Sequence, residues 1–231
     1  MILEKRLEII LDTLEKEEAV SNKILTEKLK VSESTLRRDL SYLQDMGKIK
    51  RVHGGAVLNN ISLKEKGFAD NEKTKQKEKS IIGQKAAKLI NKASFIYLDA
   101  GSTCGALIEY LSVDQDITIV TNGLMHVDKL IARNIKTILL EGEIKPSTKV
   151  TTGIKTLESI SKYNFDLAFI GANGYDEIGF YTADPNEAVV KSKAIHNSTR
   201  AYILADKSKE NIKYFKTIAK RDEIKLITEE E

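Results

Sequence analysis

From residue 77 to the end of the chain, helical segments alternate with short apolar runs, and this alternation constrains the fold more than any other feature. The apolar runs, which start at residues 94, 117, 136, 167, 201 and 224, are SFIYLDA, ITIVTN, KTILLEG, LAFIGANG, AYILAD and IKLIT. The spacing of apolar residues predicts helices over about 77–90, 103–111, 124–132, 186–198 and 214–220. Strands that are apolar on both faces are typical of a parallel sheet covered by helices on both sides. We therefore predict an α/β domain with a mostly parallel sheet over residues 77–231.

The first 57 residues show a different pattern, in which three helical segments precede a hairpin. The first segment has apolar residues at helical spacing, namely Leu3, Leu7, Ile10, Leu11 and Leu14. Ser21 and Ser32 stand at the N-cap positions of a second and a third helix. The stretch KIKRVHGGAVL, from residue 48, predicts a small hairpin around two glycines. This order is the layout of a winged helix-turn-helix domain, which we assign to residues 1–57.

Residues 58–76 separate the two patterns. Their sequence, LNNISLKEKGFADNEKTKQ, is polar and has no sustained periodicity, so we interpret it as a linker. A chain of 231 residues is long enough for two domains of this kind.

The predicted third helix carries two adjacent arginines in the stretch VSESTLRRDLSYL, residues 31–43. If its leucines face the core, its outer surface carries Ser34, Thr35, Arg37 and Arg38. Glu33, four residues before Arg37, is a candidate ion-pair partner for it, whereas Arg38 has none at that spacing. Arginine donates two hydrogen bonds to a guanine edge or a phosphate. We predict that this helix and the hairpin, which adds Arg51 and His53, contact DNA; the alternative is a solvated helix face.

The charge distribution agrees with that prediction better than the total charge does. The net charge is only +3, but residues 28–53 contain seven basic and three acidic residues. A single cysteine, Cys104, excludes an internal disulfide, and we interpret it as a small buried thiol. The three histidines show no metal-ligand spacing, so we predict no metal and no cofactor. No apolar run is long enough to span a membrane and no signal peptide is evident, so we expect a cytoplasmic protein.

The carboxyl ends of the predicted strands are polar and rich in glycine, which is where open parallel sheets bind ligands. The first of them, AGST, places Gly101, Ser102 and Thr103 between a strand and a helix. Backbone N–H groups and hydroxyls in that position suit a phosphate or a carboxylate, although a tight strand–helix turn explains them equally well. The loop lacks the Gly-Lys-Ser/Thr of a nucleotide-binding P-loop.

The remaining strand ends offer further polar groups with two readings each. Asp99 either accepts hydrogen bonds from sugar hydroxyls or caps a helix, and Thr121 and Asn122 either bind the same ligand or close a turn. Asn173 precedes a glycine in a common turn pair. Two charged pairs, Glu187 with Lys191 and Asp206 with Lys209, either interact with each other or point into the crevice.

The chain resembles the DeoR-type family of bacterial transcriptional regulators along almost its whole length. The N-terminal part carries the resemblance through VSESTLRRDLSYLQDMGKIKRVHGGA, and the C-terminal part through LDAGST, IVTN, DLAFIGANG, NEAVVK and ADKSK. The resemblance implies a winged helix-turn-helix domain joined to an α/β domain resembling ribose-5-phosphate isomerase and glucosamine-6-phosphate deaminase. It also implies a repressor, usually of sugar or nucleoside catabolism genes, that a phosphorylated sugar releases from operator DNA.

Motif by motif, the resemblance implies two sets of contact residues. The DNA-binding set is Ser32, Ser34, Thr35, Arg37, Arg38, Arg51 and His53. The effector-binding set is Asp99, Gly101, Ser102, Thr103, Thr121, Asn122, Asn173, Glu187, Lys191, Asp206 and Lys209. The sequence departs from the family at three places: the loop reads DAGSTC instead of DAGTT, Glu141 replaces the first of two glycines, and an arginine is missing near Asn71–Glu72.

We therefore predict a DNA-binding repressor that is a dimer or tetramer and not an enzyme, with double-stranded operator DNA and a phosphorylated sugar as partners and no membrane partner. The alternative is a phosphosugar isomerase or deaminase with an appended DNA-binding domain, although Glu187, Asp99 and Asp206 form no convincing acid–base pair. A third reading is an activator of transcription, which would need a polymerase-facing surface that we do not locate in the sequence.

Overall fold

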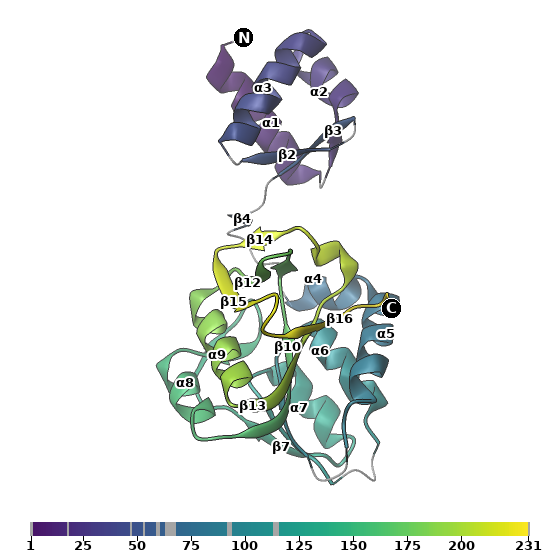
Figure 1. The fold of residues 1–231 in the computed structure, drawn as a ribbon, viewed down its shortest axis with the longest axis vertical. Helices are drawn as coiled ribbons and strands as arrows, with labels where there is room; N and C mark the ends of the chain where they lie inside the picture. Colours follow the sequence, from purple (N-terminus) through teal and green to yellow (C-terminus); the bar gives the residue numbers. More distant parts are fainter. Residues whose placement is uncertain are drawn as a thin grey trace. The chain divides into compact units, whose positions relative to one another are not determined.

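The computed structural model describes residues 2–17, 19–46, 48–52, 54–58, 61–62, 68–91, 94–112 and 116–230 (Figure 1). The chain divides into two compact units, Met1–Ile61 and Ser62–Glu231, which we call unit 1 and unit 2. Each is described by itself.

Unit 1 consists of three helices and a small antiparallel sheet in its described residues. The helices are α1 (Leu3–Lys16), α2 (Asn22–Leu29) and α3 (Glu33–Asp45), and the strands are β1 (Val20–Ser21), β2 (Ile49–Val52) and β3 (Gly55–Leu58). The strand order is β1-β3-β2, so β2 and β3 form the predicted hairpin. Ser21 and Ser32 accept hydrogen bonds from the backbone N–H groups of Ile24 and Thr35, each at 3.3 Å. Both predicted N-caps are therefore confirmed.

The core of unit 1 holds α3 in place through leucines and one ion pair. Leu36, Leu40 and Leu43 are each 2% exposed and pack against α1 and α2. Asp39, also 2% exposed, accepts two hydrogen bonds from the guanidinium group of Arg6 on α1, at 2.7 and 2.9 Å. A bidentate pair of this kind fixes the rotation of α3 about its axis as well as its distance from α1.

Unit 2 is built on one sheet. In the described residues its strand order is β16-β13-β10-β5-β6-β7, and every neighbouring pair is parallel. These strands are β5 (Phe95–Leu98), β6 (Thr118–Thr121), β7 (Lys136–Leu139), β10 (Phe165–Gly171), β13 (Ser198–Leu204) and β16 (Lys225–Ile227). The predicted parallel sheet is confirmed.

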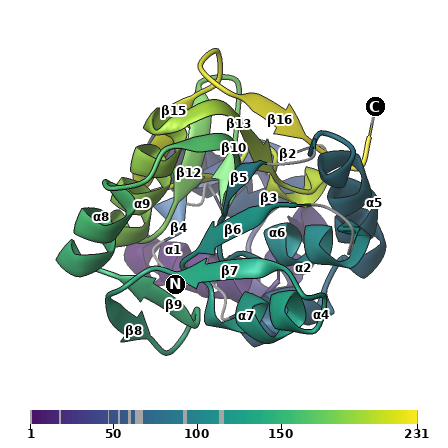
Figure 2. The same cartoon turned by 90° about the horizontal axis from the view of Figure 1, so that it is seen from below.

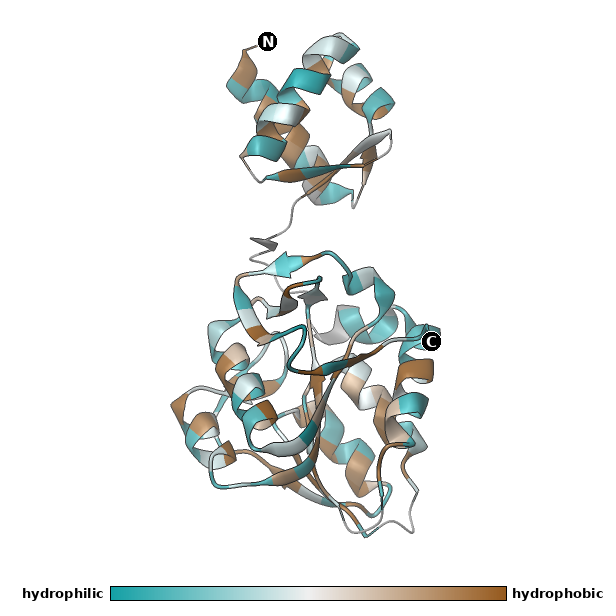
Figure 3. Ribbon diagram, viewed as in Figure 1, coloured by the Kyte–Doolittle hydropathy of each residue, from teal (hydrophilic) through white to brown (hydrophobic). Residues whose placement is uncertain are grey.

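Helices cover both faces of this sheet, as Figure 2 shows. One face packs against α5 (Gln76–Ala87), α6 (Ser102–Leu107) with the 3₁₀ turn η1 (Ile108–Tyr110), and α7 (Leu124–Ile131). The other packs against α8 (Ile154–Ile160) and α9 (Pro185–His196). Side chains alternate along the strands, so Ile96 and Leu98 enter the first core and Tyr97 enters the second. Figure 3 shows the central strands coloured largely as hydrophobic.

Smaller elements of unit 2 lie outside the parallel sheet. They are α4 (Phe68–Lys73), β8 (Glu143–Lys145), β9 (Val150–Thr152), β11 (Gly174–Tyr175), β12 (Gly179–Thr182), η2 (Lys207–Lys209), β14 (Lys213–Tyr214) and β15 (Lys216–Lys220). A further short strand, β4 (Ile61–Ser62), lies at the boundary of the two units. The range predicted as a linker therefore contains β4 and α4, while residues 59–60 and 63–67 lie outside the described residues.

The prediction of a helix over 214–220 was wrong. This segment forms β14 and β15, and β15 pairs antiparallel with β12. Ile218 and Ala219 are adjacent in the sequence and both are buried against the second core. The apolar spacing in so short a run does not distinguish a helix from a strand. The pairing with β12, which no local pattern specifies, selects the extended form.

Candidate functional sites

The outer face of α3 carries the residues predicted to contact DNA. Ser32, Ser34, Arg37 and Arg38 are exposed and Thr35 is half-buried. The Ser32 hydroxyl lies 2.9 Å from that of Ser34 and 3.0 Å from that of Thr35, so the three hydroxyls form a network at the start of the helix.

Neither arginine is neutralised within the described part of the chain. Arg37 and Arg38 make no ion pair and no side-chain hydrogen bond there, so the predicted alternative of a Glu33–Arg37 pair is not observed. The adjacent Asp39 is the residue that is buried and paired. The RRD sequence therefore divides into two free cations on the surface and one structural carboxylate beneath them.

A shallow depression on this face extends the candidate DNA-contacting surface beyond the predicted residues. Its lining is Ser34, Arg37, Arg38, Ser41, Tyr42 and Asp45. Ser41, Tyr42 and Asp45 are not among the residues predicted from the sequence. Their spacing from Ser34 and Arg38, at three, four or seven residues, is the signal that would have placed them on the same face.

The hairpin contributes one described residue to this surface. Arg51 on β2 is exposed, and its guanidinium group donates a hydrogen bond to the Ser41 hydroxyl on α3 at 3.1 Å. The bond orients Arg51 alongside the helix. His53 lies outside the described residues.

The candidate effector site in unit 2 is centred on an ion pair at the carboxyl end of β5. Asp99 is 1% exposed, accepts a hydrogen bond from the Gly171 backbone N–H at 2.8 Å, and pairs with the ammonium group of Lys191 on α9. Lys191 also donates to the Gly171 carbonyl at 3.2 Å. Three predicted segments, DAGST, DLAFIG and NEAVVK, therefore meet here, and Lys191 pairs with Asp99 rather than with Glu187.

The charge state of this centre is set by its partners. Burial alone would lower the pKa of Lys191, but the charges of Asp99 and Glu187 outweigh burial and raise it, so the ammonium form persists. Burial and the Asp99 charge raise the pKa of the Cys104 thiol well above its usual value. Cys104 donates weakly to the Phe169 carbonyl at 3.6 Å, so it is a buried neutral thiol.

Glycines on neighbouring segments allow close packing against the loop that follows β5. A Cβ on Gly123 would lie 2.8 Å from the Ala100 Cα, and a Cβ on Gly171 would lie 3.1 Å from an Asp99 carboxylate oxygen. Gly101, Ser102 and Thr103 are half-buried at the start of α6. Neither hydroxyl has a hydrogen-bond partner among the described residues, so both are available to a ligand.

The polar groups after β6 are used within the protein. The Thr121 hydroxyl accepts from the Gly123 N–H at 3.0 Å, and Asn122 accepts from the Tyr97 hydroxyl at 3.0 Å and donates to the Thr151 carbonyl at 3.3 Å. Both residues are buried. The Thr121 side chain closes a turn, and the Asn122 side chain links β5 to β9. They shape the site beside the Ser102 loop.

His126, which the sequence analysis left unassigned, is buried under the same loop. It is 1% exposed, its Nδ1 lies 3.5 Å from the Thr121 hydroxyl, and its Nε2 has no hydrogen-bond partner in the described structure. A Cβ on Gly105 would lie 2.9 Å from Nε2, so the ring packs directly against α6. Burial lowers the pKa of His126 to about 4, which keeps the ring neutral.

Glu187 belongs to a second ion-pair group at the start of α9. Its carboxylate accepts from the Lys145 ammonium at 2.9 Å and from the Thr148 hydroxyl at 3.1 Å. Lys145 also pairs with Asp184 at 3.0 Å, and Asp184 caps α9 by accepting from the N–H groups of Asn186 and Glu187. This group ties the β8–β9 hairpin to α9, a connection that only the tertiary fold creates.

The remaining predicted residues have identifiable structural partners. The Asn173 side-chain carbonyl accepts from the Thr182 hydroxyl at 2.6 Å and the Ala183 N–H at 3.3 Å. Asp206, 2% exposed, caps η2 by accepting from the Ser208 N–H at 3.1 Å. Lys209, half-buried, is the last residue of that turn. Glu141 is exposed just beyond β7.

Three further observations limit other readings. A groove beside the edge strand β16, lined among others by Lys85, Tyr202 and Arg221, contains none of the predicted effector residues. In the described ranges, no group of three or more His, Cys, Asp or Glu residues is placed to hold a metal ion. The helices described are all too short or too polar to cross a membrane.

Two family descriptions match the two units. The DeoR-like helix-turn-helix domain matches residues 6–62, and the DeoR C-terminal sensor domain matches residues 74–230.

Curated relatives match along most of the chain. FruR of Bacillus subtilis (strain 168), an uncharacterized HTH-type transcriptional regulator, is 42% identical over 90% of this chain and 84% of its own length. The HTH-type transcriptional repressor GlcR of the same strain is 33% identical over 98% and 88%. The glycerol-3-phosphate regulon repressor of Escherichia coli (strain K12) is 32% identical over 87% and 80%.

Solved structures match this chain at low identity. The eIF2B delta structure from Chaetomium thermophilum gives a TM-score of 0.50 at 13% identity, over 69% of this chain and 58% of that chain. Ribose 5-phosphate isomerase A from Methanocaldococcus jannaschii gives 0.43 at 18% identity, over 57% and 53%.

Proposed function

Because the chain belongs to the DeoR family of transcriptional regulators, we propose that unit 1 binds operator DNA and that unit 2 binds a phosphorylated sugar which releases the protein from it. The protein is a regulator and not an enzyme, as the relatives are transcriptional regulators and repressors. Repression of sugar-related genes agrees with their names. We expect it to act in the cytoplasm, where bacterial operators lie.

The observation that carries the DNA-binding part is the pair of unpaired arginines on the outer face of α3. A carboxylate three or four residues away stabilises an arginine on a helix surface. Arg37 and Arg38 have no such match in the described residues, and Arg51 is held beside them by Ser41. The start of the second helix of a helix-turn-helix pair is the part that meets base edges. We propose Ser32, Ser34, Thr35, Arg37, Arg38 and Arg51 as DNA contacts, together with His53.

The effector part rests on the two unpartnered hydroxyls beside a buried charged centre. We propose that Ser102, Thr103 and the backbone at Gly101 bind the phosphate, and that the Asp99–Lys191 pair recognises the sugar. Asn173, Glu187, Asp206 and Lys209 are proposed to line the rest of the site, and Thr121 and Asn122 to shape it. Ser102 keeps the hydroxyl of the family loop, and the exposed Glu141 and the missing arginine affect which sugar phosphate binds.

A mobility-shift titration tests the proposal. The duplex would be the DNA upstream of the protein's own gene, with and without glucose 6-phosphate, fructose 6-phosphate, glycerol 3-phosphate or inorganic phosphate. We expect sequence-specific binding that one sugar phosphate reverses without being consumed. Consumption of the sugar phosphate would instead favour the isomerase or deaminase reading. Higher expression of a reporter gene in the presence of the protein would show an activator instead of a repressor.

The double variant Ser102→Ala/Thr103→Ala tests the effector site separately. We expect it to bind operator DNA normally and to resist release by the sugar phosphate. Release at the wild-type concentration would show that this loop does not hold the phosphate.

We also propose a dimer or tetramer, because helix-turn-helix proteins pair two half-sites with a symmetric assembly. Sedimentation of the full chain with and without operator DNA measures the state. A monomer bound to a single half-site would contradict it.

A further inference from the structure

Lys79 is a buried lysine whose position neither the ion pairs nor the predicted site explains. It lies in the first turns of α5 and is only 6% exposed. Among the described residues no carboxylate lies within 4.0 Å of its ammonium group, although Lys5, Lys75, Lys129 and other lysines have such partners. Burying an ammonium group without a counter-charge is costly. Groups other than a carboxylate must therefore stabilise the cation here.

The ammonium group of Lys79 caps helix α4. It donates to the backbone carbonyl of Asn71, within α4, and to that of Thr74, just after it, the latter at 2.8 Å. A cation at this end also interacts favourably with the helix dipole. The end of α4 is therefore held by one side chain from α5.

Helix α4 contacts the elements that form the candidate effector site. It packs against α6, whose first residues are Ser102 and Thr103, and the two helices lie side by side in Figure 1. Its Glu72 pairs with Lys129 on α7, the helix that follows Asn122, at 3.1 Å. In the described residues it is also the first helix of unit 2, and it follows β4 at the boundary of the two units.

Lys79 is also within electrostatic reach of the strand-end residues Asp206 and Lys209. Burial lowers its pKa, the Asp206 carboxylate opposes this, and Lys209 adds to it. The carboxylates of Glu72 and Glu78 also act on Lys79, and Lys209 is a second cation beside it. Two neighbouring cations favour the binding of a phosphate.

We propose that Lys79 is shared between helix α4 and the bound effector. In the free protein its ammonium group caps α4, and in the liganded protein it turns to the phosphate of the effector and releases the end of α4. This inference rests on the proposed function, and it names the contact through which effector binding reaches the segment that leads to the DNA-binding unit.

Three variants separate the two roles of Lys79. Lys79→Met removes both the cap and the charge. Lys79→Gln keeps N–H groups for the carbonyls of α4 but removes the charge, and it replaces the Met variant if that one fails to fold. Lys77→Met removes the same charge from an exposed position on the same helix and serves as the control.

Calorimetry with the sugar phosphate that releases the wild type measures the first role. We expect both Lys79 variants to lose at least about tenfold in effector affinity, the effect of one charge-assisted hydrogen bond, and the Lys77 variant to match the wild type. Hydrogen exchange of the α4 amide groups measures the second. We expect the effector to speed exchange in the wild type, and Lys79→Met to exchange fast without effector.

Two results would overturn the inference alone: wild-type effector affinity in both Lys79 variants, or α4 exchange that the effector leaves unchanged in the wild type. A wild-type protein that binds operator DNA but responds to none of the four phosphates above would instead refute the proposed effector, and the Lys79 contact with it.

Discussion

At the scale of single residues, three consecutive charged side chains on α3 have two different roles. Arg37 and Arg38 lie on the surface, whereas Asp39 forms a buried ion pair. Successive residues on a helix point about 100° apart. Asp39 therefore faces Arg6 in the core, while the two arginines face outward without partners in the described chain. Spacing alone could not decide whether Arg37 pairs with Glu33, because an exposed arginine side chain can turn either toward Glu33 or toward solvent.

Arg38→Ala is expected to weaken operator binding by about 10- to 100-fold, since a lost bidentate contact to a base costs roughly 1–3 kcal/mol. Fluorescence anisotropy with the operator duplex measures it. Lys5→Ala removes the same charge from an exposed residue of α1 and is the control. An operator affinity for Arg38→Ala equal to that of the control would rule out a specific contact.

We expect the buried His126 to make the folded protein less stable in acid. Its pKa is lowered from 6.5 to about 4 by burial, so the unfolded chain binds the proton first as the pH falls. The stability that this neutral histidine provides is present above about pH 6.5 and is lost as the pH falls towards 4. The loss amounts to about 3 kcal/mol.

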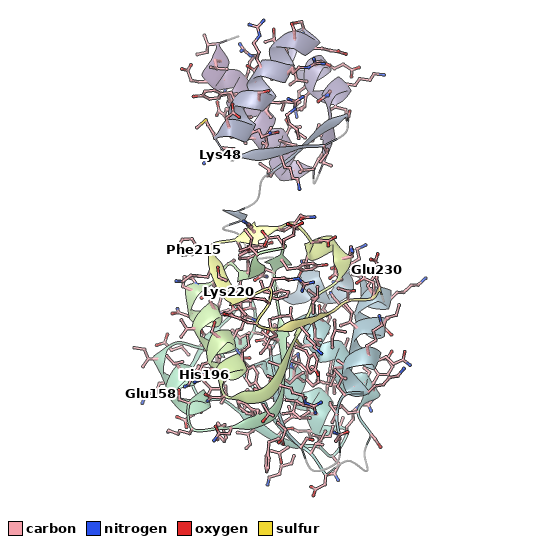
Figure 4. All side chains as sticks on the ribbon, viewed as in Figure 1. Lys48, Glu158, His196, Phe215, Lys220 and Glu230 are labelled. Carbon is pink, nitrogen blue, oxygen red and sulfur yellow. The ribbon has the colours of Figure 1, made fainter. Side chains whose placement is uncertain are left out.

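Urea unfolding at several pH values compares the wild type with His126→Asn. We expect the free energy of unfolding of the variant to change less between pH 7 and 4, by about 3 kcal/mol. His196→Asn is the matched control, because His196 is exposed at the end of α9, as Figure 4 shows. Identical pH dependence in the wild type and His126→Asn would refute the assignment.

At the scale of elements, the start of α9 joins helix capping to the placement of a hairpin. Asp184 caps two backbone N–H groups and pairs with Lys145 of β8. Partial burial would raise the pKa of Asp184, but Lys145 and the two N–H groups lower it. The carboxylate therefore stays ionised and holds both elements.

Asp184→Ala is expected to lower the free energy of unfolding by about 1–2 kcal/mol, as the loss of an N-cap does. Asp184→Asn keeps the cap and should cost less. Urea unfolding near pH 7 distinguishes the two. An equal cost for both variants would assign the stability to the Lys145 pair instead of the cap.

The segment 213–220 shows why element type is not always local. Tyr214, Phe215, Thr217 and Ile218 have high strand propensity, yet the apolar spacing also fitted a helix. Pairing with β12 satisfies the backbone groups of β15 and buries Ile218 and Ala219. Here a tertiary contact decided between two local readings.

At the scale of the whole molecule, regulation depends on linkage between two units. Effector and operator must each change the affinity of the protein for the other by the same factor. The logarithm of the operator affinity should also fall linearly with the logarithm of the salt concentration. Each phosphate contact contributes about 0.9 to this slope.

Anisotropy titrations from low to high salt, with and without the sugar phosphate, measure both effects. We expect a steep salt slope and an operator affinity that drops when effector is present. Calorimetry should give the reciprocal drop in effector affinity when operator is present. An operator affinity that is independent of salt would contradict binding through the basic face of α3.

The sequence by itself determined the elements whose signals are local: the capped helices of unit 1, the β2–β3 hairpin and the parallel strands of unit 2. Periodicity and capping depend on residues a few positions apart, so they are legible without the fold. The sequence also placed Asp99, Ser102 and Lys191 among the candidate residues through their motifs.

Only the tertiary structure decided which of these groups meet. Lys191 pairs with Asp99 on β5 and not with Glu187 four residues earlier, and Glu187 binds Lys145 and Thr148 of a hairpin region that the sequence did not predict. Lys79 caps α4 and His126 packs under the Ser102 loop for the same reason. Ion pairs and buried contacts depend on distances in space between residues far apart in the chain, and the order of the strands, not the local pattern, sets those distances.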